Sequence, residues 1–138
     1  MAFQFEPAIV LETFPLLVRG LKLTVEITVG GLFFGFFLGS AAGLMKISRN
    51  AAVRLLVGAY IESIRGTPML VQAMFLYYGV PLAIGVRIAP VTAGIIIIAV
   101  NSGAYIAEIV RGAVQSINPG QMEAGRSIGL THSQAMFH

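Results

Sequence analysis

The longest charge-free stretch of the chain constrains its fold most. From Ile27 to Leu44 there are 18 consecutive residues without a charged side chain. A helix needs about 20 apolar residues to cross the hydrocarbon layer of a bilayer. The composition points the same way, because only 11% of the 138 residues are charged, whereas soluble domains carry about 25%. The sequence therefore predicts an all-α protein that crosses a membrane several times.

Two further apolar regions predict two further membrane segments. We expect a first span at about 16–45, a second and broken one at 51–84, and a third at 90–113. The Gly-Thr-Pro sequence at 66–68 interrupts the second region, and proline breaks or kinks a helix because it lacks a backbone N–H. Either one kinked helix crosses there, or the part before the break lies in the interface and only the part after it crosses.

The basic residues after the first span predict the orientation. Lys46, Arg49 and Arg54 follow one another with no acidic residue between them, and loops rich in Lys and Arg face the cytoplasm. The amino terminus is therefore expected outside, and the polar segment 117–138 is expected in the cytoplasm. A turn opens this segment, and we expect a short surface helix at about 118–131.

The residue inventory argues against several classes of function. The chain has no cysteine, so it can have neither a disulfide framework nor a thiolate metal site. It has no G-x-x-x-x-G-K-[ST] loop for ATP, and no nucleophile–base arrangement that would indicate an enzyme. His132 and His138 lack companions at metal-ligand spacing and are interpreted as surface histidines. The net charge of +3 suits cytoplasmic loops better than nucleic-acid binding.

Glycines recur in the first span at every fourth position. They are Gly31, Gly35, Gly39 and Gly43. Residues at this spacing share one helix face, and small residues let another helix backbone come close. This face is predicted to pack tightly, either against a second subunit or a moving helix, or against another helix of the same subunit.

Polar residues inside the apolar regions suggest a substrate pathway. The candidates are Glu62, Arg65 and Gln72 around the break, and Asn101, Tyr105 and Glu108 in the third span. The last three fall within one narrow sector of a helix. Charged groups at membrane depth usually face a partner or a watery cavity. The alternatives are a salt bridge that only holds the fold, and anchoring of the third span at the interface by Glu108 and Arg111.

Three motifs carry a resemblance to a known family. They read ESIRGTPMLVQ at 62–72, NSGAYIAEIVRGAVQSI at 101–117 and GQMEAGRSIGLTHSQAMF at 120–137. In this order and spacing they resemble the permease subunits of type I ABC importers, in the polar amino acid (histidine/glutamine-type) branch. The resemblance covers nearly the whole chain.

The third motif resembles the EAA signature of these permeases. Glu123, Ala124 and Gly129 match the signature, whereas Gly125 stands where it has a second alanine. The Ile-x-Leu-Pro ending of the signature is absent. The resemblance implies that this segment is a coupling helix that contacts an ATPase, through Gly120 together with these four residues.

The resemblance also implies partners and a location. Two ATPase subunits would bind ATP and Mg²⁺, so this chain would need no cofactor of its own. A second permease subunit, identical or closely related, and an extracytoplasmic solute-binding protein would complete an amino acid importer in the lipid of the cell inner membrane. The family has five spans, so about two more are expected beyond this chain. The alternatives are a channel or structural subunit without an ATPase, and an inactive truncated permease.

Overall fold

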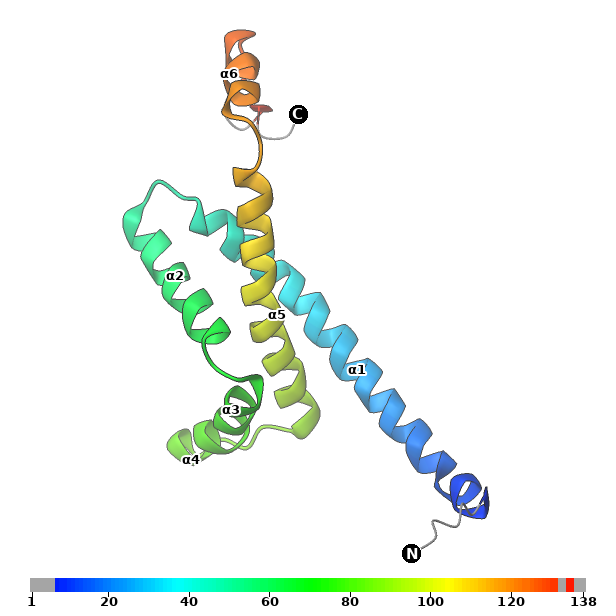
Figure 1. The fold of residues 1–138 in the computed structure, drawn as a ribbon. Coiled ribbons are helices and arrows are strands. Elements are labelled where there is room, and N and C mark those ends of the chain that lie inside the picture. Colours follow the sequence, from blue (N-terminus) through cyan, green and yellow to red (C-terminus); the bar gives the residue numbers. More distant parts are fainter. Residues whose placement is uncertain (1–6, 132–133, 136–138) are drawn as a thin grey trace, which may run out of the picture.

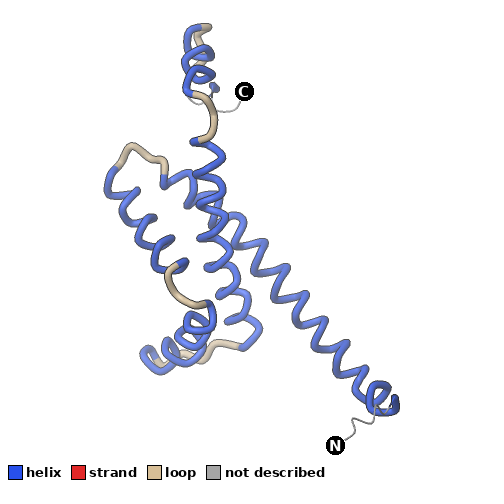
Figure 2. Tube along the Cα trace, viewed as in Figure 1, coloured by secondary structure: helices blue, strands red, loops and turns tan. Residues whose placement is uncertain are grey.

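The computed structural model describes residues 7–131 and 134–135. In this part of the chain it contains helices and no strand (Figures 1 and 2). The elements are α1 (Pro7–Lys46), α2 (Ala51–Arg65), α3 (Met69–Met74), the π-helix η1 (Phe75–Gly79), α4 (Val80–Ile84), α5 (Pro90–Gln115) and α6 (Pro119–Ser127). The all-α fold class is confirmed.

Two helices in the described part are long and apolar enough to cross a membrane. They are α1, over Leu11–Lys46, and α5, over its full 26 residues. The helix α1 is described from Pro7 onward, so helical structure precedes the predicted span at 16–45. The π-helix η1 lies in the region that follows the break.

The second apolar region is sharply bent. The helix α2 and the helical segment Met69–Ile84 meet at 105° at the Gly-Thr-Pro sequence (Figure 1). Length and composition would allow the pair to be one broken span or a re-entrant segment. The second half ends at Gly85, whose φ of +72° is the left-handed conformation that glycine adopts without strain.

The glycine face of α1 packs against α5 of the same chain. All four glycines of this face are buried. A Cβ atom added to Gly39 would lie 2.6 Å from the Gly103 carbonyl oxygen, and one added to Gly43 would lie 2.7 Å from the Ala107 carbonyl oxygen. The two helix backbones therefore approach so closely that side chains do not fit between them. This contact holds α1 and α5 together as the centre of the fold.

Candidate functional site

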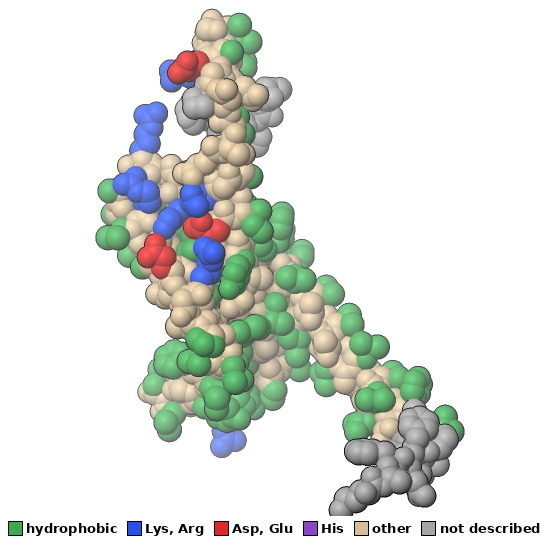
Figure 3. Space-filling view, in the orientation of Figure 1, with side chains coloured by type: hydrophobic (Ala, Val, Ile, Leu, Met, Phe, Trp, Pro, Cys, Tyr) green, Lys and Arg blue, Asp and Glu red, His purple; other side chains and the backbone are tan. Residues whose placement is uncertain are grey.

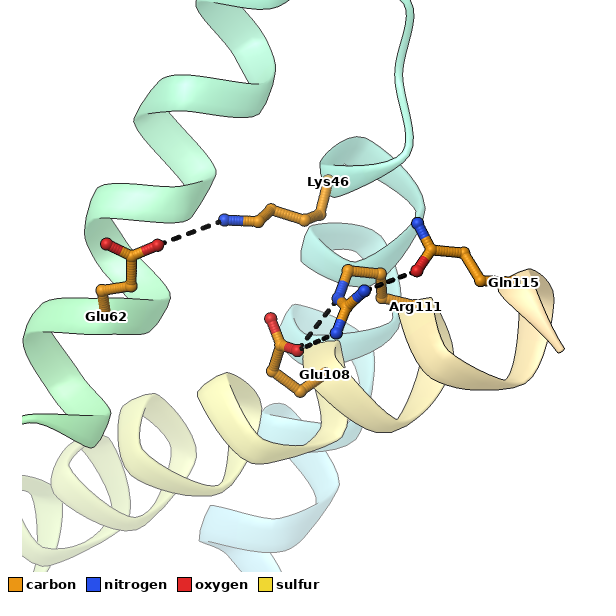
Figure 4. A network of polar contacts seen from close by, with 5 residues as sticks. All are labelled: Lys46, Glu62, Glu108, Arg111 and Gln115. Atoms are coloured by element: carbon orange, nitrogen blue, oxygen red, sulfur yellow. Dashed lines mark hydrogen bonds and ion pairs between the residues drawn. The ribbon is translucent and has the colours of Figure 1, made fainter.

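Charged side chains gather at the end of the helices that lies toward α6. Figure 3 shows most of the Lys, Arg and acidic side chains in view on this half of the face, whereas hydrophobic side chains cover most of the half around α3 and α4, with a basic side chain at its lower edge. Figure 4 shows five of the polar side chains, which come from α1, α2 and α5: Lys46, Glu62, Glu108, Arg111 and Gln115. We call these five residues the polar cluster.

Two ion pairs organise the polar cluster. Arg111 Nη2 lies 2.7 Å from Glu108 Oε2, and Lys46 Nζ lies 3.7 Å from Glu62 Oε1. The Arg111 guanidinium also donates to Gln115 Oε1 at 2.5 Å. One pair therefore joins residues three apart on α5, which helical geometry places together. The other pair ties the end of α1 to α2.

Lys46 reaches Glu62 across a glycine. A Cβ atom at Gly58 would lie 2.5 Å from Lys46 Nζ, so the missing side chain leaves the space that the lysine occupies. Gly58 lies one turn before Glu62 on the same helix. The glycine was not singled out from the sequence, although its spacing from Glu62 was visible there.

Arg65 and Tyr105 meet between α2 and α5. The Arg65 guanidinium carbon lies 5.3 Å from the centroid of the Tyr105 ring, which is the geometry of a cation–π contact. Both residues are exposed. The contact leaves the edges of the guanidinium open, so its N–H groups are available to an anionic group such as a carboxylate.

Gln72 and Asn101 meet beside the break between α2 and α3. Asn101 Nδ2 donates to Gln72 Oε1 at 3.2 Å. The Gln72 side-chain amide in turn donates to the Ile64 carbonyl at 2.7 Å and to the Thr67 carbonyl at 3.0 Å. The Gln72 side chain therefore forms hydrogen bonds with the backbone of the bend.

The six residues of the pathway hypothesis thus lie in four pairs, two of which include a partner from outside the six, Lys46 or Arg111. These are Arg65 with Tyr105, Gln72 with Asn101, Glu62 with Lys46, and Glu108 with Arg111. The structure does not pair Glu62 with Arg65, although the two are three residues apart on one helix. Tyr60, which sequence reasoning missed, adds a further bond between α2 and α5, because its hydroxyl donates to the Val100 carbonyl at 2.7 Å.

A cavity of about 360 Å³ lies beside the bend, between the end of α2, α3, η1 and α5. Apolar side chains such as Phe75 and Ile97 line most of it, and Ser63, Thr67 and Gln72 add polar atoms at one side. Because the Gln72 amide is engaged by the backbone, this cavity offers a mainly apolar surface.

The helix α6 lies beyond the end of α5, away from α2, α3 and α4 (Figure 1). Its first turn is capped by Asn118, whose side-chain oxygen accepts from the Gly120 N–H at 2.9 Å. Glu123 and Ala124 are exposed. Gly125 lies against the chain that follows, because a Cβ atom there would be 3.2 Å from Ala135 Cβ.

The end of α6 is closed by a glycine. Gly129 has a φ of +92°, its N–H donates to the Arg126 carbonyl at 3.1 Å, and the next N–H, of Leu130, donates to the Gly125 carbonyl at 3.1 Å. These bonds satisfy carbonyls at the carboxyl end of the helix and require a left-handed residue.

The predicted surface histidines, His132 and His138, lie outside the described residues. Within the described residues no group of three His, Asp or Glu side chains is placed to hold a metal ion.

Two long, closely packed helices that are apolar enough to cross a membrane, a sharply bent helix pair and a polar helix beyond them indicate an integral membrane protein. The chain belongs to the family of binding-protein-dependent transport system inner membrane components, whose family model matches residues 31–138. It is similar over 93% of its length, at 44% identity, to the glutamine transport system permease protein GlnP of Escherichia coli K12. It is also 36% identical over 89% of its length to the L-cystine transport system permease protein TcyB of Bacillus subtilis.

A solved structure agrees with these relatives. The crystal structure of an amino acid ABC transporter with histidines matches 97% of this chain with a TM-score of 0.87 and 40% sequence identity. The fold is therefore that of an ABC transporter permease, as predicted. The chain spans 59% of the E. coli relative, 52% of the B. subtilis relative and 62% of the crystallised chain.

Proposed function

We propose that this chain belongs to the transmembrane permease subunit of an ATP-driven importer that carries a polar amino acid across the cell membrane. Its similarity to glutamine and L-cystine permeases supports the substrate class. The observation that carries the proposal is the position of α6, a polar helix beyond the end of a long apolar helix (Figure 1). Such a helix suits a contact with a separate subunit that binds and hydrolyses ATP.

The connection between α6 and α5 suggests how the ATPase would act. The helix α5 runs without interruption for 26 residues, and only residues 116–118 separate it from α6. A displacement of α6 would therefore be passed along α5 to Tyr105 and Asn101, which lie on α5. In this proposal the ATP-driven closure of two ATPase subunits moves α6, and α5 changes which side of the membrane the pathway opens to.

The partners in this proposal follow from the same arrangement. Two ATPase subunits hold ATP and Mg²⁺ on the cytoplasmic side and contact the α6 segment. The residues that form the contact surface there, or that shape its backbone, are Gly120, Glu123, Ala124, Gly125 and Gly129. A second permease subunit completes the pathway, and a solute-binding protein delivers the amino acid from outside. The amino terminus faces outside, and this chain binds no cofactor.

For the pathway itself we propose Arg65, Tyr105 and Glu108. A zwitterionic amino acid needs donors for its carboxylate and an acceptor for its ammonium group. The open edges of the Arg65 guanidinium offer donors, and the Glu108 carboxylate, with one oxygen on Arg111, offers an acceptor. Tyr105 holds the guanidinium in place through its ring. Glu62 is 82% exposed in its ion pair with Lys46 and flanks this set.

The proposal is tested by reconstituting the complete transporter in vesicles with its ATPase and solute-binding protein. Uptake of labelled polar amino acids is expected to require ATP and all three components. The assay should include a panel of neutral, acidic and basic amino acids, because the proposal does not specify which side chain the transporter prefers. Uptake by the purified permease alone, without nucleotide, would instead favour a channel.

Replacing Arg65 by methionine is expected to lower uptake about tenfold at low substrate concentration, because a hydrogen bond to a charged group contributes about 1.5–3 kcal/mol. The apparent KM should rise, while ATPase activity without substrate stays unchanged. Arg87→Met is the matched control, since Arg87 is an exposed arginine in the loop between α4 and α5. Unchanged uptake kinetics in Arg65→Met would remove this residue from the pathway.

A further inference from the structure

We propose that Gln72 and Asn101 form a latch that fixes the bend between α2 and α3 and joins it to α5. The latch is the hydrogen bond between these two side chains together with the bonds that Gln72 makes to the backbone of the bend. Its role in transport rests on the proposed function, whereas its role in holding the bend does not. In this view Gln72 and Asn101 are positioning residues, and neither contacts the substrate.

Pro68 removes one backbone hydrogen bond at the bend. In a continuous helix the N–H of residue 68 would donate to the carbonyl of Ile64, but proline has no N–H. Gln72 Nε2 lies 2.7 Å from that same carbonyl oxygen. The glutamine side chain therefore supplies the donor that the proline lacks.

The neighbouring carbonyls at the end of α2 have donors close by in the sequence. The Glu62 carbonyl accepts from the Gly66 N–H at 2.8 Å, and the Ser63 carbonyl accepts from the Thr67 hydroxyl at 2.9 Å. Local groups thus pair with these two carbonyls. The Thr67 hydroxyl also reaches the Ile64 carbonyl, at 3.4 Å, but the shorter bond to that carbonyl, at 2.7 Å, comes from the Gln72 side chain eight residues further along. An unpaired carbonyl is costly in apolar surroundings, where no water replaces the missing donor.

The bonds to the bend fix the orientation of the Gln72 amide. Its nitrogen faces three acceptors, namely the Ile64 carbonyl, the Thr67 carbonyl and the Thr67 hydroxyl at 2.9 Å. Its oxygen is therefore turned to the Asn101 amide nitrogen at 3.2 Å. Only an amide offers both donors and an acceptor at this position: an ionised glutamate offers no donor, and a leucine offers neither.

The latch links the bend to the helix that leads to α6. Asn101 lies on α5, and α5 reaches α6 after a short connection. When α5 moves, the Gln72–Asn101 bond requires the bend to follow or the bond to break. A transporter with a broken latch should therefore still bind substrate, but should turn over more slowly.

The test uses the complete transporter in lipid nanodiscs and compares wild type with Gln72→Leu, Gln72→Glu and Asn101→Asp. Hydrogen–deuterium exchange of peptides covering 62–74 reports on the bend, and uptake kinetics report on transport. Gln72→Leu and Gln72→Glu should each raise exchange at the bend at least tenfold. Both should lower maximal uptake at least fivefold with an unchanged KM. Ser102→Ala is the control, because among the described residues the Ser102 hydroxyl bonds within α5, to the Ile98 carbonyl.

Asn101→Asp tests the bond between the bend and α5 separately from the bonds that stabilise the bend itself. Aspartate has nearly the shape of asparagine but places an acceptor against the fixed Gln72 oxygen, so it should lower maximal uptake with little change in exchange. If Gln72→Leu does not assemble into the transporter, Asn101→Asp still tests the bond between Gln72 and Asn101. Unchanged exchange in both Gln72 variants would overturn the latch, and so would a raised KM with unchanged maximal uptake. If wild type shows no ATP-driven uptake, the proposed function fails, while the exchange result still decides whether Gln72 holds the bend.

Discussion

Replacing Gly39 by valine is expected to destabilise the folded permease by about 3 kcal/mol. A Cβ atom at this position would lie 2.6 Å from both the Gly103 carbonyl oxygen and Ile106 Cβ. Neither is the end of a flexible side chain, so the relief has to come from moving α1 away from α5. Overpacking a close contact costs typically about 1–3 kcal/mol, and we expect the upper end here because the contact joins the two longest helices.

The measurement is the thermal midpoint of the detergent-solubilised protein, together with its yield in the monodisperse fraction. About 3 kcal/mol should lower the midpoint by about 10 °C for a chain of this size. Gly20→Val is the matched control, because Gly20 lies on the same helix and a Cβ atom there meets nothing within 4 Å. Equal midpoints for the two variants would show that the α1–α5 contact is not what holds the fold.

The sequence was sufficient for the helices and for the position of the break, because both depend on local properties. Apolar runs of sufficient length predict helices, and Pro68 ends one of them by its own covalent structure. The angle of 105° and the bonds that stabilise it were not predicted. They depend on Gln72 reaching back to Ile64 and across to Asn101, and no local rule specifies such contacts.

The ion pairs of the polar cluster show the same limit. Glu108 and Arg111 form an ion pair, as their spacing allows, because residues three apart on a helix are neighbours. Glu62 and Arg65 have the same spacing but do not pair. Glu62 forms an ion pair with Lys46 of α1, and the Arg65 guanidinium lies over the Tyr105 ring of α5. Packing between helices therefore decides among partners that spacing alone treats as equal.

The glycine face was recognised from its spacing, but its partner was left open. Spacing shows which residues share a face and gives no information about what approaches it. The structure places α5 of the same chain there, with the carbonyl oxygens of Gly103 and Ala107 at the closest points. The interpretation as packing within the subunit therefore accounts for this face.

Replacing Gly129 by valine is expected to uncouple the permease from its ATPase. Gly129 closes α6 with a φ of +92°, a conformation that costs a β-branched residue about 1–3 kcal/mol. The helix α6 lies away from α2, α3 and α4 (Figure 1), so those helices do not hold it in shape. The end of α6 should unwind and lose the surface that we propose for the ATPase.

ATP-driven uptake is therefore expected to fall at least tenfold, and co-purification of the ATPase subunit should be lost, while the thermal midpoint of the permease stays within about 2 °C of wild type because α1 and α5 are untouched. Glu123→Lys should also weaken the ATPase contact, through charge alone and with α6 intact. Gly112→Val is the control, because Gly112 lies on α5 with nothing within 4 Å of an added Cβ. If Gly129→Val retains both the ATPase and uptake, α6 is not the coupling element, since its shape would then have no effect on transport.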